Sequence, residues 1–323
     1  MKRAYVFPGQ GAQSVGMGKD SFEACTKVKE AYEQADQIFS TYHKEAGLNP
    51  ATISAVSFEG PEEALTRTLY TQPAILTLSI ALANEVKSLI KSGKTEKPDF
   101  VAGHSLGEFS ALYMADVLSL EDVVKLVVKR ADLMEQAPAG AMSAIVGMDE
   151  TKLNEIIDTV EGASVANYNA PDQIVATGTK EGMAKLGEVV TKFAEENSVK
   201  ARVIPLNVGG AFHSSLMQAA SEEFSAVIDS CDFKDASIPV IQNINAKATT
   251  KASEIKENLK QQMTGSVQWT KTVAQLITSV EELVEIGPGK ILVGLVKKQE
   301  RRFPVKSING TSDISSLKEA AAA

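Results

Sequence analysis

Short apolar runs alternate with longer amphipathic segments through the first part of the chain. The runs predict two strands, and the segments with helical periodicity predict three helices: residues 4–7 and 100–102, then 22–39, 73–91 and 106–115. Strands separated by helices indicate a parallel sheet covered on both faces. Active sites on such sheets lie at the carboxyl ends of the strands. Gln10 and Ser105, which each follow a strand, are therefore expected at one rim.

The pattern changes near the middle of the chain. The elements predicted there follow the order strand, helix, strand, strand, helix, strand: 141–146, 150–160, 163–168, 174–177, 181–196 and 201–206. This order is the ferredoxin-like unit. We therefore predict an α/β fold whose large subdomain, residues 1–138 and 206–323, carries an inserted ferredoxin-like small subdomain, residues 139–205.

The remainder of the chain continues the first pattern. It contains three predicted helices, one strand and an apolar run that leads to a Gly-Pro-Gly turn: residues 222–230, 252–263 and 267–276, then 238–244, and then 281–286. The alanine run at residues 320–323 is set aside from the fold prediction.

The bulk composition is that of an ordinary globular protein. The 323 residues are 44% hydrophobic and 23% charged, so the chain is long enough to bury a large core. The formal net charge of −8 gives no reason to expect nucleic acid or an anionic membrane as a partner. Cys25 and Cys231 are expected to be reduced, partly buried thiols, and neither belongs to a metal-binding pattern.

The distribution of apolar residues also bears on location. The first residues do not match a signal peptide, and no apolar stretch approaches the roughly 20 residues that span a bilayer. We therefore expect a cytoplasmic, monomeric protein with neither a metal nor a cofactor.

The hexapeptide Gly-His-Ser-Leu-Gly-Glu at residues 103–108 follows the second predicted strand. The pattern Gly-x-Ser-x-Gly between a strand and a helix is typical of a nucleophile elbow, a sharp turn that projects the serine hydroxyl. The alternative is a glycine-flanked serine that only caps a helix. The preceding strand and the following helix favour Ser105 as a nucleophile.

A serine nucleophile needs a base, because a free hydroxyl is almost wholly protonated at neutral pH. The chain contains three histidines. His43 lies in a polar stretch and is expected to be a solvated surface group, whereas His104 is expected to pack around the elbow. Elimination leaves His213, in a glycine-containing loop before a helix, as the base. Its alternative role is that of a hydrogen-bonded structural histidine.

Arg130 interrupts the apolar stripe of a further predicted helix, residues 119–136, whose start carries the capping signal of Ser119 and Asp122. A guanidinium on an apolar face must meet an anion. That anion is either an internal carboxylate in a structural ion pair or a substrate carboxylate held in bidentate fashion. The sequence leaves these two possibilities open.

Gln10 lies in the turn after the first strand. An oxyanion hole can be formed by the backbone N–H group of such a turn together with the N–H group of the residue after the nucleophile. A plain β-turn is the alternative.

Together these segments resemble the malonyl-CoA:acyl carrier protein transacylases of type II fatty acid synthesis along nearly the entire chain. The segments that carry the resemblance are residues 7–13, 16–18, 71–74, 103–108, 130, 140–142, 212–214, 267–269 and 287–290. The sequence departs from the family pattern at Gly209 and Ser215, which both lie beside His213.

The resemblance implies an α/β-hydrolase-like large subdomain with a ferredoxin-like small one. It also implies that Ser105 takes a malonyl group from malonyl-CoA as an ester and hands it to the phosphopantetheine thiol of acyl carrier protein. In this ping-pong reaction His213 would act as base and then as acid. Gln262 would orient the imidazole through its backbone carbonyl group.

The resemblance assigns roles to three further residues. The backbone N–H groups of Gln10 and Leu106 would hold the oxyanion, and Arg130 would bind the malonyl carboxylate. Carrier proteins of this family are acidic, so a basic patch is expected to dock them. The densest basic cluster is residues 297–302, which a solvated helix face also explains, and Lys185 with Lys192 is the competing patch.

Three other functions stay open at this point. A serine hydrolase or thioesterase would share the elbow and would need an acid such as Asp172. A malonyl transferase could instead serve a polyketide synthase. A catalytically silent module that binds carrier protein is the alternative without enzymatic activity.

Overall fold

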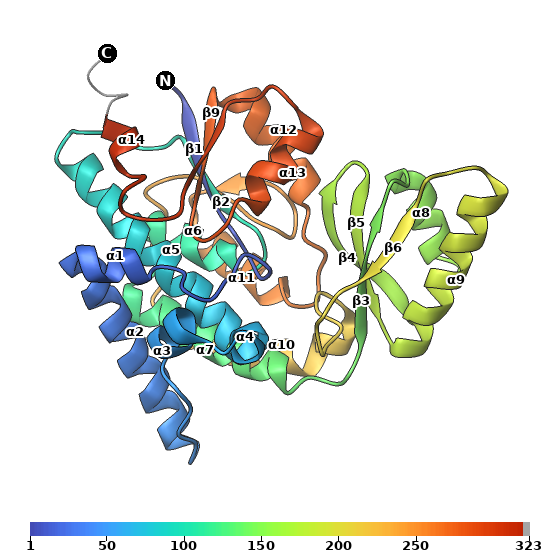
Figure 1. Ribbon diagram of the computed structural model, residues 1–323, viewed down its shortest axis with the longest axis horizontal. Helices are drawn as coiled ribbons and strands as arrows, with labels where there is room; N and C mark the ends of the chain where they lie inside the picture. The colour runs from blue at the N-terminus through green and yellow to red at the C-terminus, as the bar shows by residue number, and fades with distance from the viewer. Residues whose placement is uncertain (319–323) are drawn as a thin grey trace.

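The computed structural model describes residues 1–318 and contains two sheets that lie next to each other along the long axis of the molecule (Figure 1). The larger sheet has six strands in the order β10-β9-β1-β2-β7-β8, and the smaller has four in the order β4-β5-β3-β6. The predicted α/β class is confirmed. Residues 320–323, which were set aside from the fold prediction, lie outside the described residues.

The larger sheet is parallel except for its last pair, β7 and β8. Its strands are β1 Arg3–Phe7, β2 Phe100–Gly103, β7 Val240–Ile241, β8 Ala248–Thr249, β9 Glu282–Ile286 and β10 Val305–Ile308. Phe7 at the end of β1 is in register with Gly103 at the end of β2. The turns that carry Gln10 and Ser105 therefore leave the sheet at the same rim, as the sequence predicts.

Helices cover both faces of the larger sheet, which explains why the central strand β1 is buried along its whole length. Side chains alternate along β1, so Tyr5 and Phe7 pack into the larger core whereas Ala4 and Val6 pack against α12 and α13. The helices of this part are α1 Lys19–Ala24, α2 Thr26–Glu45, α3 Ile53–Glu59, α4 Glu62–Thr66, α5 Thr68–Lys91, α6 Gly107–Met114, α7 Leu120–Glu135, α10 Gln218–Ser230, α11 Ala252–Gln261, α12 Trp269–Ser279, α13 Ile291–Gln299 and α14 Ser315–Lys318.

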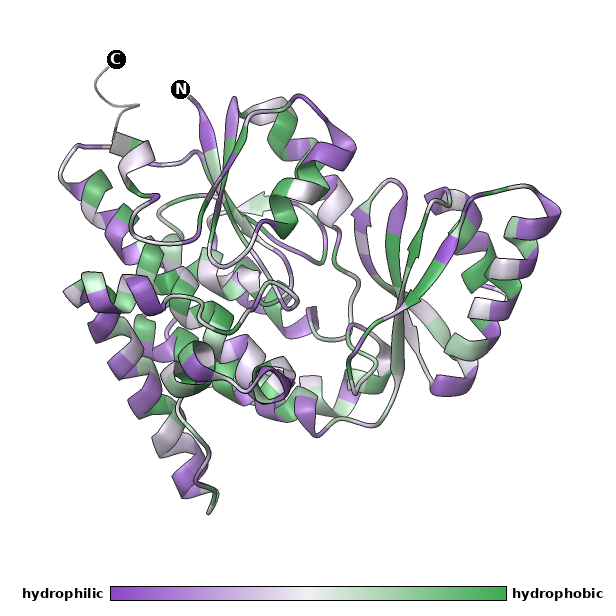
Figure 2. Ribbon diagram, in the orientation of Figure 1, coloured by the Kyte–Doolittle hydropathy of each residue, from purple (hydrophilic) through white to green (hydrophobic). Residues whose placement is uncertain are grey.

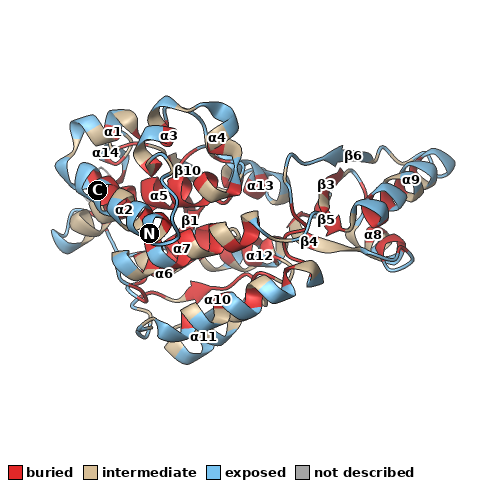
Figure 3. Ribbon diagram, turned by 90° about the horizontal axis from the view of Figure 1, so that it is seen from below, coloured by how far each residue is buried: buried red, intermediate tan, exposed pale blue. Residues whose placement is uncertain are grey.

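Helix α5 runs through the centre of the larger core, where Figure 3 shows mostly buried residues. Within residues 1–318 it is the one helix long and apolar enough to cross a membrane by length and composition alone. The expectation that no apolar stretch approaches this length is therefore wrong for α5. However, 72% of its apolar window is buried inside the fold, so packing against neighbouring helices accounts for its composition.

The smaller sheet has a hydrophobic core of its own, which includes Ile145, Leu153, Ile174 and Leu186. Its elements follow the predicted order: β3 Ala141–Val146, α8 Glu150–Ile157, β4 Ala163–Ala170, β5 Gln173–Gly178, α9 Lys180–Glu196 and β6 Arg202–Pro205. All three strand pairs are antiparallel, and α8 and α9 lie on one face (Figure 1). Figure 2 shows both hydrophobic and hydrophilic residues along α9, as expected for a helix with one buried face.

The predicted helix at residues 22–39 is two helices, because Cys25 adopts an extended conformation between α1 and α2. Helix α2 then continues to Glu45. This extension places His43 one turn after Phe39 on the buried face, where its Nδ1 lies 2.9 Å from the Phe39 carbonyl oxygen. The prediction that His43 is a solvated surface group is therefore wrong: the residue is 1% exposed.

Other differences concern short elements. The strand expected at residues 238–244 is reduced to Val240–Ile241, because Gln242 and Asn243 turn into the rim of the sheet. Neither strands β8 and β10 nor helices α3, α4, α13 and α14 are predicted from the sequence. Cys25 and Cys231 are free and half-buried, as expected.

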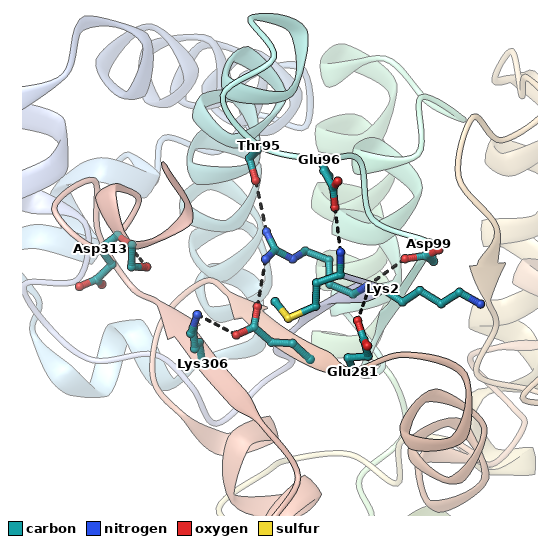
Figure 4. A network of polar contacts seen from close by, with 11 residues as sticks. Lys2, Thr95, Glu96, Asp99, Glu281, Lys306 and Asp313 are labelled. Carbon is teal, nitrogen blue, oxygen red and sulfur yellow. Dashed lines mark hydrogen bonds and ion pairs between the residues drawn. The ribbon is translucent and has the colours of Figure 1, made fainter. Parts of the chain in front are cut away.

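A buried ion pair joins the amino ends of β1 and β9, at the edge opposite the rim (Figure 4). Arg3 Nη2 lies 3.3 Å from Glu282 Oε2, and Arg3 Nη1 donates to Thr95 Oγ1 at 3.2 Å. Lys306 on β10 approaches the other carboxylate oxygen of Glu282 at 2.7 Å. Arg3 and Glu282 are both buried, so each charge depends on the other.

Replacing Glu282 by glutamine should lower the free energy of unfolding by about 3–5 kcal/mol, because the buried Arg3 guanidinium loses its countercharge. Urea unfolding followed by circular dichroism measures this loss. The matched control is Glu59→Gln, which removes an exposed pair with Lys19 and should leave the urea midpoint unchanged. Equal midpoints for the two variants would contradict a stabilising role of the buried pair.

Candidate active site

Ser105 lies in a sharp turn between β2 and α6, with a left-handed backbone φ of +49°. A Cβ atom on Gly103 would overlap the backbone of Gly107, and a Cβ atom on Gly107 would overlap the carbonyl group of Phe7. Both glycines are therefore required by the close approach of β1, β2 and α6. A left-handed conformation costs a residue other than glycine on the order of 1–3 kcal/mol. The packing around Ser105 imposes this conformation.

Asn243, which follows β7, holds the turn from the side. Its Oδ1 accepts the Ser105 N–H at 2.7 Å, and its Nδ2 donates to the Gly103 carbonyl oxygen at 2.6 Å. The N–H of Ser105 is thus engaged in fixing the backbone. The next N–H, that of Leu106, lies at the start of α6.

His213 faces Ser105, with 2.8 Å between its Nε2 and the serine Oγ. Its Nδ1 lies 2.9 Å from the Gln262 carbonyl oxygen and 3.1 Å from that of Gly265. Carbonyl oxygens only accept hydrogen bonds, so Nδ1 carries the proton and Nε2 is left to accept the Ser105 hydroxyl proton. The loop before α10 is fixed by Ser214, whose Oγ donates to the Ala211 carbonyl oxygen at 2.6 Å.

The surroundings keep the imidazole of His213 neutral. Burial, reinforced by the positive charge of Arg130, lowers the pKa of His213 from 6.5 to about 3. The hydrogen bonds to backbone carbonyl groups oppose this shift without cancelling it. The group beside the Ser105 hydroxyl is therefore a proton acceptor over the whole physiological pH range.

Arg130 projects from α7, whose first turn is capped by Ser119 as predicted. The guanidinium is 1% exposed. Its Nη1 donates to Gln72 Oε1 at 2.7 Å, and its Nη2 donates to Gln262 Oε1 at 3.0 Å and to Ser105 Oγ at 3.2 Å. Burial lowers the pKa of Arg130 to about 10, so the side chain still carries its charge at neutral pH.

The partners of Arg130 are neutral oxygens. Among the ion pairs formed by residues 1–318, none involves this guanidinium, and its Nε has no hydrogen-bond partner there. Of the two alternatives that the sequence left open, the structural ion pair is absent from the described part of the chain. A buried cation that contacts only neutral groups favours the second alternative, an anion-binding role.

A cavity of about 100 Å³ lies over the Ser105 hydroxyl. It is lined from both sheets: Gln10 and Leu106 lie in the turns that follow β1 and β2 of the larger one, and Met142 and Asn167 lie on β3 and β4 of the smaller. Within the described residues, neither the Gln10 N–H nor the Leu106 N–H donates to a protein oxygen. Two backbone donors thus remain available at the rim.

His104 packs around the elbow, as predicted. The edge of its ring meets Trp269, with 5.5 Å between ring centroids, and its Nε2 lies 2.7 Å from Asn169 Oδ1. Burial lowers the pKa of His104, so this imidazole is also neutral. Its side chain reaches Asn169 on β4 of the smaller sheet.

The structure brings all six predicted site residues to one place. Ser105, His213, Gln262 and Arg130 are joined by hydrogen bonds, and Gln10 and Leu106 line the same cavity. Three further residues were not assigned a role from sequence: Gln72, Glu108 and Asn243. Each of them has a feature in the sequence that could have drawn attention to it. Gln72 is a glutamine in a long apolar helix, Glu108 belongs to the elbow hexapeptide, and Asn243 lies near the end of a predicted strand.

The arrangement suits nucleophilic transfer of an acyl group that carries a negative charge. It combines a hydroxyl, a neutral imidazole, two available N–H groups and a cation whose contacts are neutral. Residues 1–318 contain no group of three or more His, Cys, Asp or Glu residues that could hold a metal ion.

Comparison with known proteins extends this picture. A family model described as the acyl transferase domain matches residues 4–314. The malonyl CoA-acyl carrier protein transacylase of Bacillus subtilis (strain 168) is 44% identical over 321 residues, which are 97% of this chain and 95% of that protein.

Two solved structures have the same fold. The crystal structure of the malonyl-CoA:ACP transacylase of Synechocystis sp. PCC 6803 superposes with a TM-score of 0.85 at 37% identity, covering 98% of this chain and 100% of that one. A malonyl-transacylase solved in complex with a type II PKS acyl-carrier protein superposes with a TM-score of 0.87 at 31% identity, covering 99% and 100%.

An acyl transferase is therefore the class of protein that this fold and this site define, and the family match spans almost the whole chain. Within that class, the chain belongs to the malonyl CoA-acyl carrier protein transacylase family. The resemblance inferred from the motifs is confirmed.

His213 should stay neutral, with its proton on Nδ1, between pH 8 and about pH 5, because its pKa lies near 3 rather than at 6.5. The chain has three histidines, so ¹H–¹⁵N NMR spectra can follow each imidazole separately. The variant Arg130→Gln should move the titration of His213 upward, since it removes a nearby positive charge. A wild-type midpoint near 6.5 would contradict the neutral buried imidazole.

Proposed function

We propose that this protein transfers a malonyl group from malonyl-CoA to the phosphopantetheine thiol of acyl carrier protein, through a malonyl ester on Ser105. The observation that carries this proposal is the buried guanidinium of Arg130, which lies 3.2 Å from the serine Oγ and donates hydrogen bonds only to neutral oxygens. A malonyl thioester brings a carboxylate close to the carbonyl group that a nucleophile attacks. The relatives named for this reaction support the same conclusion.

In the first half-reaction, Ser105 Oγ attacks the thioester carbonyl while its proton passes to His213 Nε2. The N–H groups of Gln10 and Leu106 stabilise the oxyanion that forms. The C–S bond then breaks, and the departing thiolate of coenzyme A takes the proton from His213. A malonyl ester on Ser105 and free coenzyme A result.

The second half-reaction reverses these steps with the carrier thiol. His213 accepts the thiol proton, the thiolate attacks the ester carbonyl, and the C–O bond to Ser105 breaks. The proton on His213 returns to the serine oxygen. Throughout, the Gln262 carbonyl group holds the imidazole in place and stabilises its protonated form.

Binding of the malonyl group is also expected to raise the pKa of the base, His213. The charge of Arg130 is one cause of the low pKa of His213. A malonyl carboxylate bound to Arg130 offsets that charge, so the imidazole becomes more basic when the correct acyl group is present.

The structure bears on the rival hydrolase. Asp172, the candidate acid, is exposed and pairs with Lys298 at 3.6 Å, whereas the Nδ1 of His213 faces carbonyl groups. The hypothesis of a serine hydrolase also gives no role to Arg130. Both observations favour transfer over hydrolysis.

We place the small subdomain at residues 139–205, where the second sheet and its separate core lie. For the carrier protein, we favour docking at residues 297–302. Lys185 and Lys192 each pair with a glutamate on α9, whereas Lys297, Arg301 and Arg302 form no ion pair within residues 1–318. We further propose that the protein acts as a monomer in the cytoplasm.

Incubation with malonyl-CoA should give a malonyl adduct on Ser105, visible by peptide mass spectrometry, which disappears when acyl carrier protein is added. Ser105→Ala should remove the adduct and lower the transfer rate by about 10⁴-fold or more. Release of free malonate without transfer would instead indicate a hydrolase. Absence of any adduct would leave only a binding module. Parallel assays with carrier proteins of fatty acid and polyketide synthesis identify the acceptor.

Arg130→Ala should lower malonyl loading of Ser105 by about 100-fold, because the substrate carboxylate loses its charged partner. Loading from acetyl-CoA, which has no second carboxyl group, should be unchanged or improved. Mass spectrometry of samples quenched at successive times measures the rates of malonyl and acetyl loading. An equal loss for both substrates would show that Arg130 only supports the structure.

A further inference from the structure

Glu108, the last residue of the elbow hexapeptide, is buried beneath Ser105 in the first turn of α6. Its Oε2 accepts hydrogen bonds from Gln262 Nε2 at 2.8 Å and from the Asn243 N–H at 3.4 Å. Its Oε1 accepts from Gln242 Nε2 at 3.2 Å. All of these partners are donors, and none of them carries a charge. The reaction proposed above gives this carboxylate no role.

The side chain of Gln262 lies between Glu108 and Arg130. Its Nε2 donates to Glu108 and also to the Ser105 carbonyl oxygen at 2.9 Å, while its Oε1 accepts from Arg130 Nη2 at 3.0 Å. A side-chain amide has one accepting end and one donating end. Two acceptors on one side and a donor on the other therefore select a single orientation of this amide.

We propose that Glu108 is a positioning residue for malonyl selection, which acts by fixing the orientation of the Gln262 amide and thereby the place of the Arg130 guanidinium. This inference rests on the proposed role of Arg130 as the ligand of the malonyl carboxylate. Without an acceptor at residue 108, the Gln262 amide loses one of the two acceptors that turn its oxygen toward Arg130 and keeps only the Ser105 carbonyl oxygen. The guanidinium then loses one of the contacts that hold it beside Ser105.

The charge of Glu108 contributes in the same direction. It favours the charged form of Arg130, yet no oxygen of Glu108 makes an ion pair with the guanidinium. A countercharge separated from Arg130 by one amide compensates part of the cost of burial. It also leaves the guanidinium contacts on the cavity side available to a substrate carboxylate.

Burial favours the neutral form of the Glu108 carboxyl group. Burial raises the pKa of Glu108 to about 7, whereas the bonds from Gln262, Gln242 and Asn243 and the charge of Arg130 favour ionisation. An amide at this position would direct an NH₂ group into surroundings made of donors. Glu108→Gln is therefore a nearly isosteric change that replaces one of the two accepting oxygens by a donor, which then faces the donors of Gln262 and Asn243 on one side or of Gln242 on the other.

The test compares loading of Ser105 from malonyl-CoA and from acetyl-CoA in Glu108→Gln. We expect the malonyl-to-acetyl ratio of kcat/KM to fall by at least about tenfold, because only malonyl loading depends on the placement of Arg130. The matched control is Glu285→Gln. Glu285 is also buried, has a pKa raised to about 7 and accepts the N–H groups of Leu292 and Val293, but it lies under α13. Its replacement should leave the ratio unchanged.

A double-mutant cycle separates positioning from general damage to the fold. Gln262→Ala keeps the backbone carbonyl that holds His213 but removes the amide. If Glu108 acts through that amide, adding Glu108→Gln to Gln262→Ala should change the ratio by less than about twofold. If Glu108→Gln does not fold, Glu108→Asp withdraws the carboxylate from Gln262 and should lower the ratio in the same way.

Two results would overturn the proposal: an unchanged ratio in Glu108→Gln, whether or not malonyl and acetyl loading fall together, or effects that multiply in the double variant. Failure of the wild-type protein to load malonyl on Ser105 would instead refute the proposed function itself. The two failures are therefore distinguishable in one set of measurements.

Discussion

The close packing of β1, β2 and α6 at one rim is the constraint on which the site depends. Gly107 lies against the end of β1, Gly103 lies against Gly107, and the chain passes between the two glycines through a left-handed residue. That residue is Ser105. Its N–H is held by Asn243 and its carbonyl oxygen by Gln262, which leaves only the hydroxyl directed toward the cavity.

Elements with a strong local period could be predicted from the sequence. The strand at residues 141–146 matches the structure at both ends, and the capping signal at Ser119 marks the true start of α7. Elements defined by distant partners could not. Strand β7 has two residues and is defined only by its neighbours β2 and β8, so the apolar run around it suggests a longer strand. His43 is expected at the surface because its sequence neighbours are polar, but α2 continues to Glu45 and places this side chain on its buried face.

The candidate site divides in the same way. Ser105 is visible because its pattern is local, and Arg130 is visible because it violates a local pattern. Gln72, Glu108 and Asn243 neither form nor interrupt a local sequence pattern. Their hydrogen-bond partners lie far away along the chain. Arg130 is 58 residues from Gln72, and the Gln262 amide is 154 residues from Glu108. Only the folded chain shows that these polar groups form one hydrogen-bonded cluster.

This cluster explains how one cation can govern both substrate choice and chemistry. A buried guanidinium is costly unless neighbouring groups compensate its charge. Here neutral amide oxygens contact it and an acid lies one amide away, so compensation is incomplete and a carboxylate of the right length completes it. Burial is the main cause of the low pKa of His213, and the same unbalanced charge lowers this pKa further. In the proposed reaction, the acyl group that neutralises Arg130 therefore also increases the basicity of the imidazole that must activate Ser105, whereas a neutral acyl group has neither effect.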